Sequence, residues 1–379
     1  MKKSLIALAA VAASGAAFAQ SSVTVFGVVD SAVSYVNGQD NWSGLNSGGN
    51  QTSRLGFRGV EDLGGGLKAN FWLEAGILAD NGSGKSGYSA NEVANDGLAF
   101  KRRATVGLSG NFGEVRMGRE LTAAYNATSR YDVFGQVGFG ASKVWADAGV
   151  NGDSTTQRVS NMVTYLSPDF SGFRANVNYG FGEDKDAQTA KSSNSASSYM
   201  GAGLTYDNGP LSLGLGLERR NAGANTAEFI DHDSNPLTPK VFNGEYDVTA
   251  WSLGGSYNFG VAKLAAAYRN SEAKWTDGVD SAKDKTKGYY IGLSAPVGAV
   301  GEVKASYNRY EITEAGEAKQ KADQFALGYV HNMSKRTAVY GTYAYIKNKD
   351  GANVRLSSDV ALKDGEKQHA VQVGIRHAF

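Results

Sequence analysis

Arginines recur in this sequence where apolar and polar side chains alternate. In SRLGFRG, Leu55 and Phe57 alternate with Arg54 and Arg58. Because successive side chains of a β-strand point to opposite faces, both arginines fall on one face and both apolar side chains on the other. A guanidinium is permanently charged and carries several donors, so it attracts anions without covalent chemistry. The stretch predicts a charged strand face in contact with water.

Another arginine and a glutamate follow from the same alternation. In TQRVSNMVTY, an apolar face with Val159 and Val163 places Arg158 and Ser160 on the polar face. In LKANFWLEA, the apolar face leaves Glu74 on the polar one. The polar faces are therefore predicted to be mostly basic, with one carboxylate that offsets part of the charge.

The remaining polar residues do not support catalysis. The chain has no cysteine, which excludes disulfides, thiolate catalysis and thiolate metal ligands. The Asp-His-Asp run at 231–233 reads as a solvated loop, and neither His331 nor His377 lies beside an evident acid partner. We therefore expect no catalytic residue, no metal site and no cofactor.

The N-terminal residues read as a secretory signal. MKKSLIALAAVAASGAAFA combines two lysines, an apolar run and a small-x-small cleavage site, so residues 1–19 are predicted to be a signal peptide. Its removal changes the 38 basic and 37 acidic residues of the full chain to 36 and 37. A nearly neutral chain does not fit a nucleic-acid-binding protein, which would be strongly basic.

Strand-like alternation continues through residues 20–379, which form one domain. The chain has 49 Gly and only 5 Pro, which suits many strands because Pro cannot donate to a β-ladder. Beyond the signal, no apolar run reaches the roughly 20 residues of a membrane-spanning helix. The other structure that satisfies the backbone polar groups in lipid is a closed β-barrel.

The connections indicate the size of this barrel. Seven short turns alternate with eight longer polar stretches, which makes fifteen connections and sixteen strands. The longer stretches are 38–50, 79–98, 121–156, 184–197, 220–246, 273–286, 313–320 and 348–367. The pattern predicts an all-β fold: a 16-stranded antiparallel transmembrane β-barrel with short periplasmic turns and long extracellular loops.

The C-terminal stretch VQVGIRHAF ends in mid-strand. Val371, Val373, Ile375 and Phe379 share one face. In a closed barrel the last strand pairs with the first, here expected in SSVTVFGVVDSAVSYV, and this removes both sheet edges. Phe379 is then expected at the lipid–water interface, where aromatic side chains gather.

Several stretches are similar to the general porins of β-proteobacteria. They are SSVTVFGVVDSAVSYV, SRLGFRGVEDLGGGLKANFWLE, FKRRATVGLSGNFGEVRMGRE and GYVHNMSKRTAVYGTYAYIKNKD, and the terminal VGIRHAF resembles an outer-membrane assembly signal. The resemblance covers nearly the whole mature chain. It implies a bacterial outer-membrane location, a homotrimer, contact with the assembly machinery through Phe379, and passive diffusion of small hydrophilic solutes.

The same resemblance implies a constriction loop. In the similar porins the third long loop folds into the barrel, which here points to residues 121–156. The polar candidates of this loop are Arg130, Asp132, Lys143, Asp147 and Asp153. The alternative is a loop that lies over the extracellular rim.

The resemblance also implies which arginines line the constriction. Anion-preferring members carry one wall arginine in each of three blocks, which match SRLG, FKRR and QRVSN. These blocks point to Arg54, Arg102 and Arg158, with Glu74 partly offsetting their charge. Arg58 and Arg103 complete the candidate pore residues.

One assignment remains in conflict. In FKRRATVGL, facing Val106 and Leu108 to lipid turns Arg103 inward and Arg102 outward. An arginine facing hydrocarbon at mid-membrane costs about 2–4 kcal/mol. A strand that begins one residue later, or a β-bulge, would bring Arg102 inward as well.

These features favour a water-filled porin that prefers anions. A substrate-specific porin and a non-conducting adhesin share the barrel and remain alternatives. An outer-membrane enzyme would need a Ser/His or Asp/His constellation on the barrel, and the sequence does not supply one.

Overall fold

The computed structural model describes most of the chain after its N-terminus. The described residues are 22–85, 97–145, 157–182, 198–222, 245–276, 281–357 and 360–379. The predicted signal peptide at 1–19, the loop acids Asp147 and Asp153, and the Asp-His-Asp run at 231–233 lie outside them.

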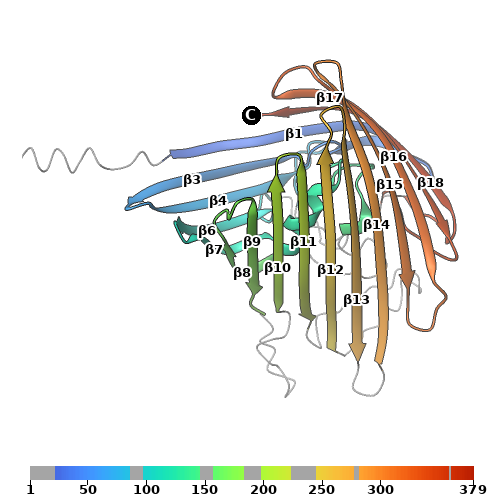
Figure 1. The fold of residues 1–379 in the computed structure, drawn as a ribbon. Helices are drawn as coiled ribbons and strands as arrows, with labels where there is room; N and C mark the ends of the chain where they lie inside the picture. Colours follow the sequence, from blue (N-terminus) through green and yellow to red (C-terminus); the bar gives the residue numbers. More distant parts are fainter. Residues whose placement is uncertain are drawn as a thin grey trace, which may run out of the picture.

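Sixteen antiparallel strands close into a barrel, which confirms the predicted fold (Figure 1). Each barrel strand pairs with the next, and β1 also pairs with β18, which closes the sheet on itself. The barrel strands are β1 (Ser22–Val36), β3 (Arg54–Gly64), β4 (Leu67–Ile77), β6 (Arg103–Gly110), β7 (Gly113–Leu121), β8 (Arg158–Leu166), β9 (Phe173–Gly180), β10 (Tyr199–Asn208), β11 (Leu211–Ala222), β12 (Glu245–Asn258), β13 (Lys263–Thr276), β14 (Ser281–Val297), β15 (Gly301–Thr313), β16 (Gln320–Asn332), β17 (Thr337–Lys349) and β18 (Lys367–Ala378). The connections hold β2 (Trp42–Ser47), β5 (Gly84–Lys85), α2 (Ala123–Thr128), η1 (Ser129–Tyr131) and η2 (Lys143–Trp145).

Alternation gives the barrel an apolar outer face. On β14, Tyr289 and Ile291 are exposed, whereas Tyr290 between them is buried. On β1, Val29 is exposed and its neighbour Asp30 is fully buried. Exposed apolar side chains on one face and polar ones on the other are typical of strands between lipid and a water-filled lumen.

The last strand closes the barrel against the first, as predicted. Nine residue pairs join β1 to β18, from Val28 opposite Ala378 to Val36 opposite Ala370. Gly27 and Phe379 exchange two backbone hydrogen bonds of 3.1 Å. Pairing therefore continues to the last residue of the chain.

The first long connection is more ordered than residues 38–50 were expected to be. It contains β2, which pairs with Ser31–Val36, the C-terminal half of β1. The physical reason is that β3 begins only at Arg54 and pairs with Ser22–Val28, the N-terminal half of β1. Strand β2 therefore pairs with the C-terminal half of β1 on the side that β3 does not reach.

The sixth long connection is shorter than the expected 273–286. Strand β13 continues to Thr276 and β14 begins at Ser281. Glu272 on β13 lies 2.5 Å from the Nζ of Lys283 and 3.9 Å from that of Lys285 on β14. These cross-strand ion pairs explain how such polar residues remain in the ladder.

The third loop connects β7 to β8, and its described residues 122–145 fold along the inner face of the barrel. Its helix α2 packs on β9–β12, and η2 packs on β13–β15. Glycines of the wall make room for it: a Cβ on Gly216 would lie 2.6 Å from the Ala124 oxygen, and one on Gly254 2.3 Å from the Tyr131 ring.

Among the helices of the described residues, none is long and apolar enough to cross a membrane.

The middle of the third loop continues around the wall towards β18. The Gln324 amide of β16 donates to the Ala141 oxygen at 3.0 Å. The backbone N–H of Phe139 donates to the Gln372 amide oxygen of β18 at 3.4 Å. The described part of the loop therefore contacts the wall from β9 to β18 and leaves the inner face of β3–β8 opposite it.

Candidate functional site

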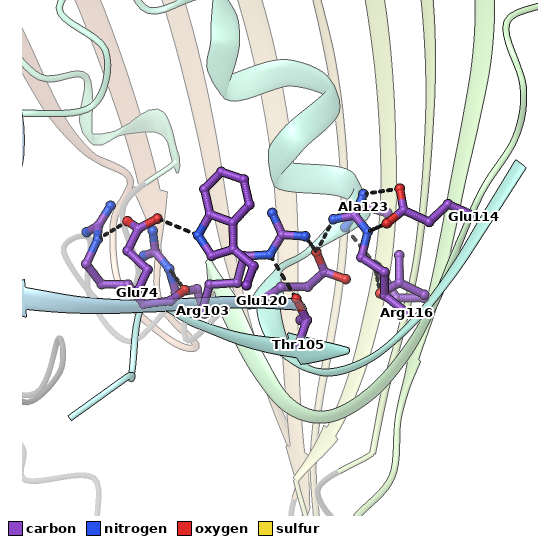
Figure 2. Close-up of polar contacts among 12 residues, drawn as sticks. Glu74, Arg103, Thr105, Glu114, Arg116, Glu120 and Ala123 are labelled. Carbon is purple, nitrogen blue, oxygen red and sulfur yellow. Dashed lines mark hydrogen bonds and ion pairs between the residues drawn. The ribbon is translucent and has the colours of Figure 1, made fainter. Parts of the chain in front are cut away.

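A carboxylate between two arginines lies on the uncovered wall (Figure 2). The Arg102 Nε lies 2.6 Å from the Glu74 Oε1, and the Arg54 Nε lies 3.9 Å from the same atom. The Trp72 indole N–H donates a 3.1 Å hydrogen bond to the Glu74 Oε2. Glu74 is 9% exposed, so these contacts hold a largely buried carboxylate in one place.

Arg102 and Arg103 both reach the inner side, for different reasons. Strand β6 begins at Arg103, which lies opposite Glu74 on β4 and therefore shares its inner face. Arg102 precedes the strand, and its backbone N–H donates to the Glu74 carbonyl at 3.1 Å. Of the two ways to resolve the conflict in FKRRATVGL, the late start of the strand is the one observed.

Arg158 joins this group from the first residue of β8. Its Nε donates a 2.9 Å hydrogen bond to the backbone oxygen of Arg102. Arg54 lies within range of electrostatic repulsion from both Arg102 and Arg158. The three arginines that the sequence matched to separate blocks are therefore close together around Glu74.

A β-bulge makes the prediction for Ser160 wrong. The register of β7 and β8 shifts between Gly118 and Glu120, so that Glu120 lies opposite Val159, and Asn161 has a positive φ of 53°. Opposite residues share a face, so Val159 lies on the face of Glu120, whereas Ser160 and Arg158, which lies opposite Leu121, are out of phase with it. The alternation that predicted both residues to face inward therefore fails here, and Arg158 reaches the group through its hydrogen bond to the Arg102 oxygen. Ser160 is exposed and accepts a 2.9 Å hydrogen bond from Arg119.

Arg58 lies on the same strand face as Arg54 but outside the group around Glu74. Its guanidinium lies 5.4 Å from the centre of the Phe26 ring and 5.3 Å from that of Trp72. These are cation–π distances. Arg58 is therefore held by aromatic rings and is exposed.

Alternation analysis of the sequence missed a second charged group beside the first. The Arg116 guanidinium lies 2.9 Å from Glu114 and 2.8 Å from Glu120, and Arg103 lies 3.8 Å from Glu120 (Figure 2). The signal was present in EVRMGRE, where Glu114, Arg116 and Glu120 alternate with apolar or outward residues. The two glutamates exceed Arg116 by one negative charge, which Arg103 balances.

Arg103 links the two groups. Its guanidinium lies 4.5 Å from the centre of the Trp72 ring, and its Nε donates to the Thr105 hydroxyl at 3.1 Å. Trp72 in turn donates to Glu74. The charged row therefore runs from Arg54 on β3 to Glu114 on β7, and each member is held by a neighbour.

Two polar candidates of the third loop, Arg130 and Asp132, form hydrogen bonds with other residues of the chain. Arg130 makes two hydrogen bonds to the Asp207 carboxylate, at 3.1 and 2.6 Å. Asp132 is 4% exposed and accepts from the backbone N–H groups of Phe134, Gln136 and Ser142 at 2.9, 3.1 and 3.0 Å. The Gln136 amide adds a fourth bond of 2.6 Å.

Asp132 is therefore a structural residue of the loop. Burial raises the pKa of its carboxyl above the usual range, and the hydrogen bonds to Ser142, Phe134 and Gln136 oppose that effect. The backbone N–H of Lys143, the next loop candidate, donates to the Tyr310 hydroxyl at 2.8 Å. The described loop thus uses its polar groups to fix its own conformation and its place on the wall.

A closed barrel with an apolar outer face, an inner loop and a charged wall opposite that loop defines a channel-forming outer-membrane protein. The Gram-negative porin family matches residues 5–351 of the chain. The chain belongs to this family. It is an outer-membrane porin, a water-filled channel for passive diffusion of small hydrophilic solutes.

Individual porins show how similar the chain is to characterised members. Outer membrane porin protein 32 of Delftia acidovorans is 46% identical over 389 residues that cover 100% of both chains. An outer membrane porin protein of Bordetella pertussis is 34% identical over 425 residues, again covering 100% of both. The solved anion-selective porin from Comamonas acidovorans is 42% identical, with a TM-score of 0.78 over 95% of this chain and 100% of that one.

Replacing Asp132 by Ala should loosen the third loop, because it removes the acceptor of four hydrogen bonds, each worth about 1 kcal/mol. We expect larger fluctuations of the open-channel current in single-channel recordings, while the barrel stays folded. Asp247→Ala is the matched control, because it removes an exposed ion pair with Arg219 between β11 and β12 that involves no described residue of the third loop and contributes at most about 1 kcal/mol. A current as quiet as that of the unmodified protein would contradict this role of Asp132.

Proposed function

We propose that this porin favours small anions and that Arg54, Arg102 and Arg158 carry the preference. The observation that carries the proposal is a group of three neighbouring arginines on the wall opposite the third loop: Arg54 and Arg102 pair with Glu74, and Arg158 bonds to the backbone oxygen of Arg102. Glu74 lies between Arg54 and Arg102 and offsets only part of their combined charge. The described acid of the loop, Asp132, is turned into the loop itself and does not compensate them either.

The magnitudes are sufficient for selectivity. A unit charge about 6 Å from a passing anion contributes roughly 3 kcal/mol at an effective dielectric constant near 20, and under about 1 kcal/mol in bulk water. A net preference of about tenfold requires only about 1.4 kcal/mol. High salt should weaken the preference, because the Debye length is only about 3 Å at 1 M.

The neighbouring charges do not oppose this preference. Arg116 is matched by Glu114 and Glu120, so the second group adds little net charge once Arg103 is counted with it. The solved porin from Comamonas acidovorans, which is 42% identical, is described as anion-selective. The solutes proposed for this chain are therefore small hydrophilic anions.

The first test is the zero-current potential of the refolded protein in a planar bilayer under a KCl gradient. We expect the chloride-preferring sign, and a potential that shrinks when Arg54 and Arg158 are both replaced by Gln. Glu74→Gln should have the opposite effect and increase the preference, because it removes the offsetting charge. A cation-preferring potential, or one that neither change alters, would overturn the proposal while leaving the channel itself established.

We also propose that the chain forms a homotrimer through the outer face of its short strands. Strands β6–β9 have only 8 or 9 residues, at or below the roughly 9–11 that a tilted strand needs to cross the hydrocarbon. Strands β12–β17 have 13 to 17. A neighbouring subunit would cover the short wall, which Figure 1 shows beside the long one.

A bulky substitution on each wall tests this arrangement. Leu108 on β6 and Leu293 on β14 are both exposed outward, at 45% and 44%. Leu108→Trp should weaken or abolish the oligomer seen in native mass spectrometry and unheated gels, whereas Leu293→Trp should leave it intact, because lipid accommodates the larger ring. A monomeric unmodified protein, or equal effects of the two substitutions, would contradict the proposed interface.

Phe379 is proposed to be read by the outer-membrane assembly machinery as well as to close the barrel. Its backbone pairs with Gly27, yet its ring remains 47% exposed, so it can be contacted from outside. Deleting Phe379 should reduce insertion in cells much more than refolding of the purified chain in detergent. An equal loss in both assays would mean that Phe379 acts through seam closure alone.

A further inference from the structure

Aromatic rings lie on the inner wall of β1 and β4, where a water-filled lumen is expected to be polar. Phe26 on β1 lies opposite Gly56 on β3, and Trp72 on β4 lies opposite Arg58 on β3. The two ring centres are 5.1 Å apart and the rings meet edge to face. Val60, the next residue of β3 on the same face, is 46% exposed. We call Phe26, Arg58, Val60 and Trp72 the inner aromatic patch.

A glycine makes room for this patch between two arginines. A Cβ on Gly56 would collide with the ring of Phe26. The ring therefore covers the inner face of β3 between Arg54 and Arg58, which are roughly 13 Å apart along an extended strand. Apolar surface beside a few charged groups is typical of a ligand site, and here it adjoins the arginine group of the wall.

Arg58 can offer its donors to a ligand. Its guanidinium lies over both rings, 5.4 Å from the centre of Phe26 and 5.3 Å from that of Trp72, and the residue is exposed. Among the described residues, no carboxylate lies within ion-pair distance of it. A guanidinium presents its N–H groups in its own plane, where one carboxylate can accept two of them.

The acids around the patch are engaged elsewhere. Glu74 pairs with Arg102 at 2.6 Å, and Glu120 pairs with Arg116 at 2.8 Å. Asp62 lies roughly 13 Å beyond Arg58 along β3, where its carboxylate accepts a 2.9 Å hydrogen bond from a backbone N–H of the turn.

A second cation adjoins the patch from the other side. The guanidinium of Arg103 lies 4.5 Å from the ring centre of Trp72. Trp72 also donates its indole N–H to Glu74, which fixes the orientation of the ring. An anion on the patch therefore meets a preformed surface of aromatic rings and guanidinium groups.

We propose that the inner aromatic patch is a weak subsite for aromatic carboxylates that pass through the channel. The carboxylate of the solute accepts from the edge of Arg58, while its ring packs edge to face against Phe26 or Trp72 and against Val60. The inference rests on the proposed preference for anions, but it assigns the discrimination among them to other residues. Binding stays weak enough for the solute to leave, as conduction requires.

Block of single-channel chloride current by added carboxylates tests the proposal. Benzoate and cyclohexanecarboxylate carry the same charge on rings of similar size, but only benzoate is aromatic. We expect benzoate to halve the current at a concentration about fivefold lower, because an aromatic pair contributes about that factor beyond its buried area. Equal block by the two acids, or no block by benzoate, would overturn the proposal.

Two substitutions locate the block on the patch. Phe26→Leu keeps an apolar side chain but removes the ring, so it should raise the half-blocking concentration of benzoate about fivefold and bring it close to that of cyclohexanecarboxylate. Because the comparison is a ratio within one variant, a general loss of stability does not produce it. An unchanged ratio would contradict recognition by the rings.

Arg58→Lys keeps the charge but loses the planar pair of donors, and it should also weaken the block by benzoate. Arg130→Lys is the matched control. Arg130 likewise lies near an aromatic ring, 5.7 Å from the centre of Tyr131, but it already binds the carboxylate of Asp207. Equal effects of the two substitutions would contradict a specific role of Arg58.

The zero-current potential in a KCl gradient separates this inference from the proposed anion preference. Phe26→Leu changes no charge and should leave the potential as it is. A chloride-preferring channel that does not distinguish benzoate from cyclohexanecarboxylate would overturn the aromatic subsite alone. Selective block by benzoate in a channel without chloride preference would support the subsite and overturn the proposed anion preference.

Discussion

Hydrocarbon leaves no backbone N–H or C=O group without a partner, and this constraint shapes the whole molecule. The pairing of β18 with β1 satisfies it at the last edge of the sheet, down to the two hydrogen bonds between Gly27 and Phe379. Once the sheet is closed, each strand has one face towards lipid and one towards the lumen. Charged side chains can then stand only inside the barrel or beyond the hydrocarbon, and both places are used.

Inside the barrel, the third loop determines which wall remains functional. The loop packs over small residues of the wall, such as Gly216 and Gly254, and Asp132 fixes its conformation through four hydrogen bonds. A loop held in this way on β9–β18 leaves the opposite wall as the charged boundary of the channel. Glu74 and Trp72 then keep the arginines of that wall apart and in place.

Period-two alternation was enough to predict the barrel, its seam and the inward face of Arg54, Arg58 and Glu74. It failed where backbone geometry departs from a regular strand. The bulge at Asn161 reverses the phase beside Ser160. Asn tolerates positive φ better than most residues, but many asparagines lie in regular strands, so QRVSN alone does not predict a bulge. The position of Arg102 depends on where β6 begins, which alternation leaves open by one residue. The sixth loop was overestimated because cross-strand pairs of Glu272 keep polar residues in the ladder.

The two faces use different cations for different tasks. Arginines line the lumen because a planar guanidinium can hold a carboxylate or stack on Trp72 and still present charge from a fixed position, as Arg102 and Arg103 do. Lysines on the outer face of β13 and β14, such as Lys274, Lys283 and Lys285, reach Glu272 through flexible stems. A permeating ion must meet charge at a defined place and leave again. The fixed arginines of the inner wall suit that requirement, whereas the outer lysines serve pairing between strands.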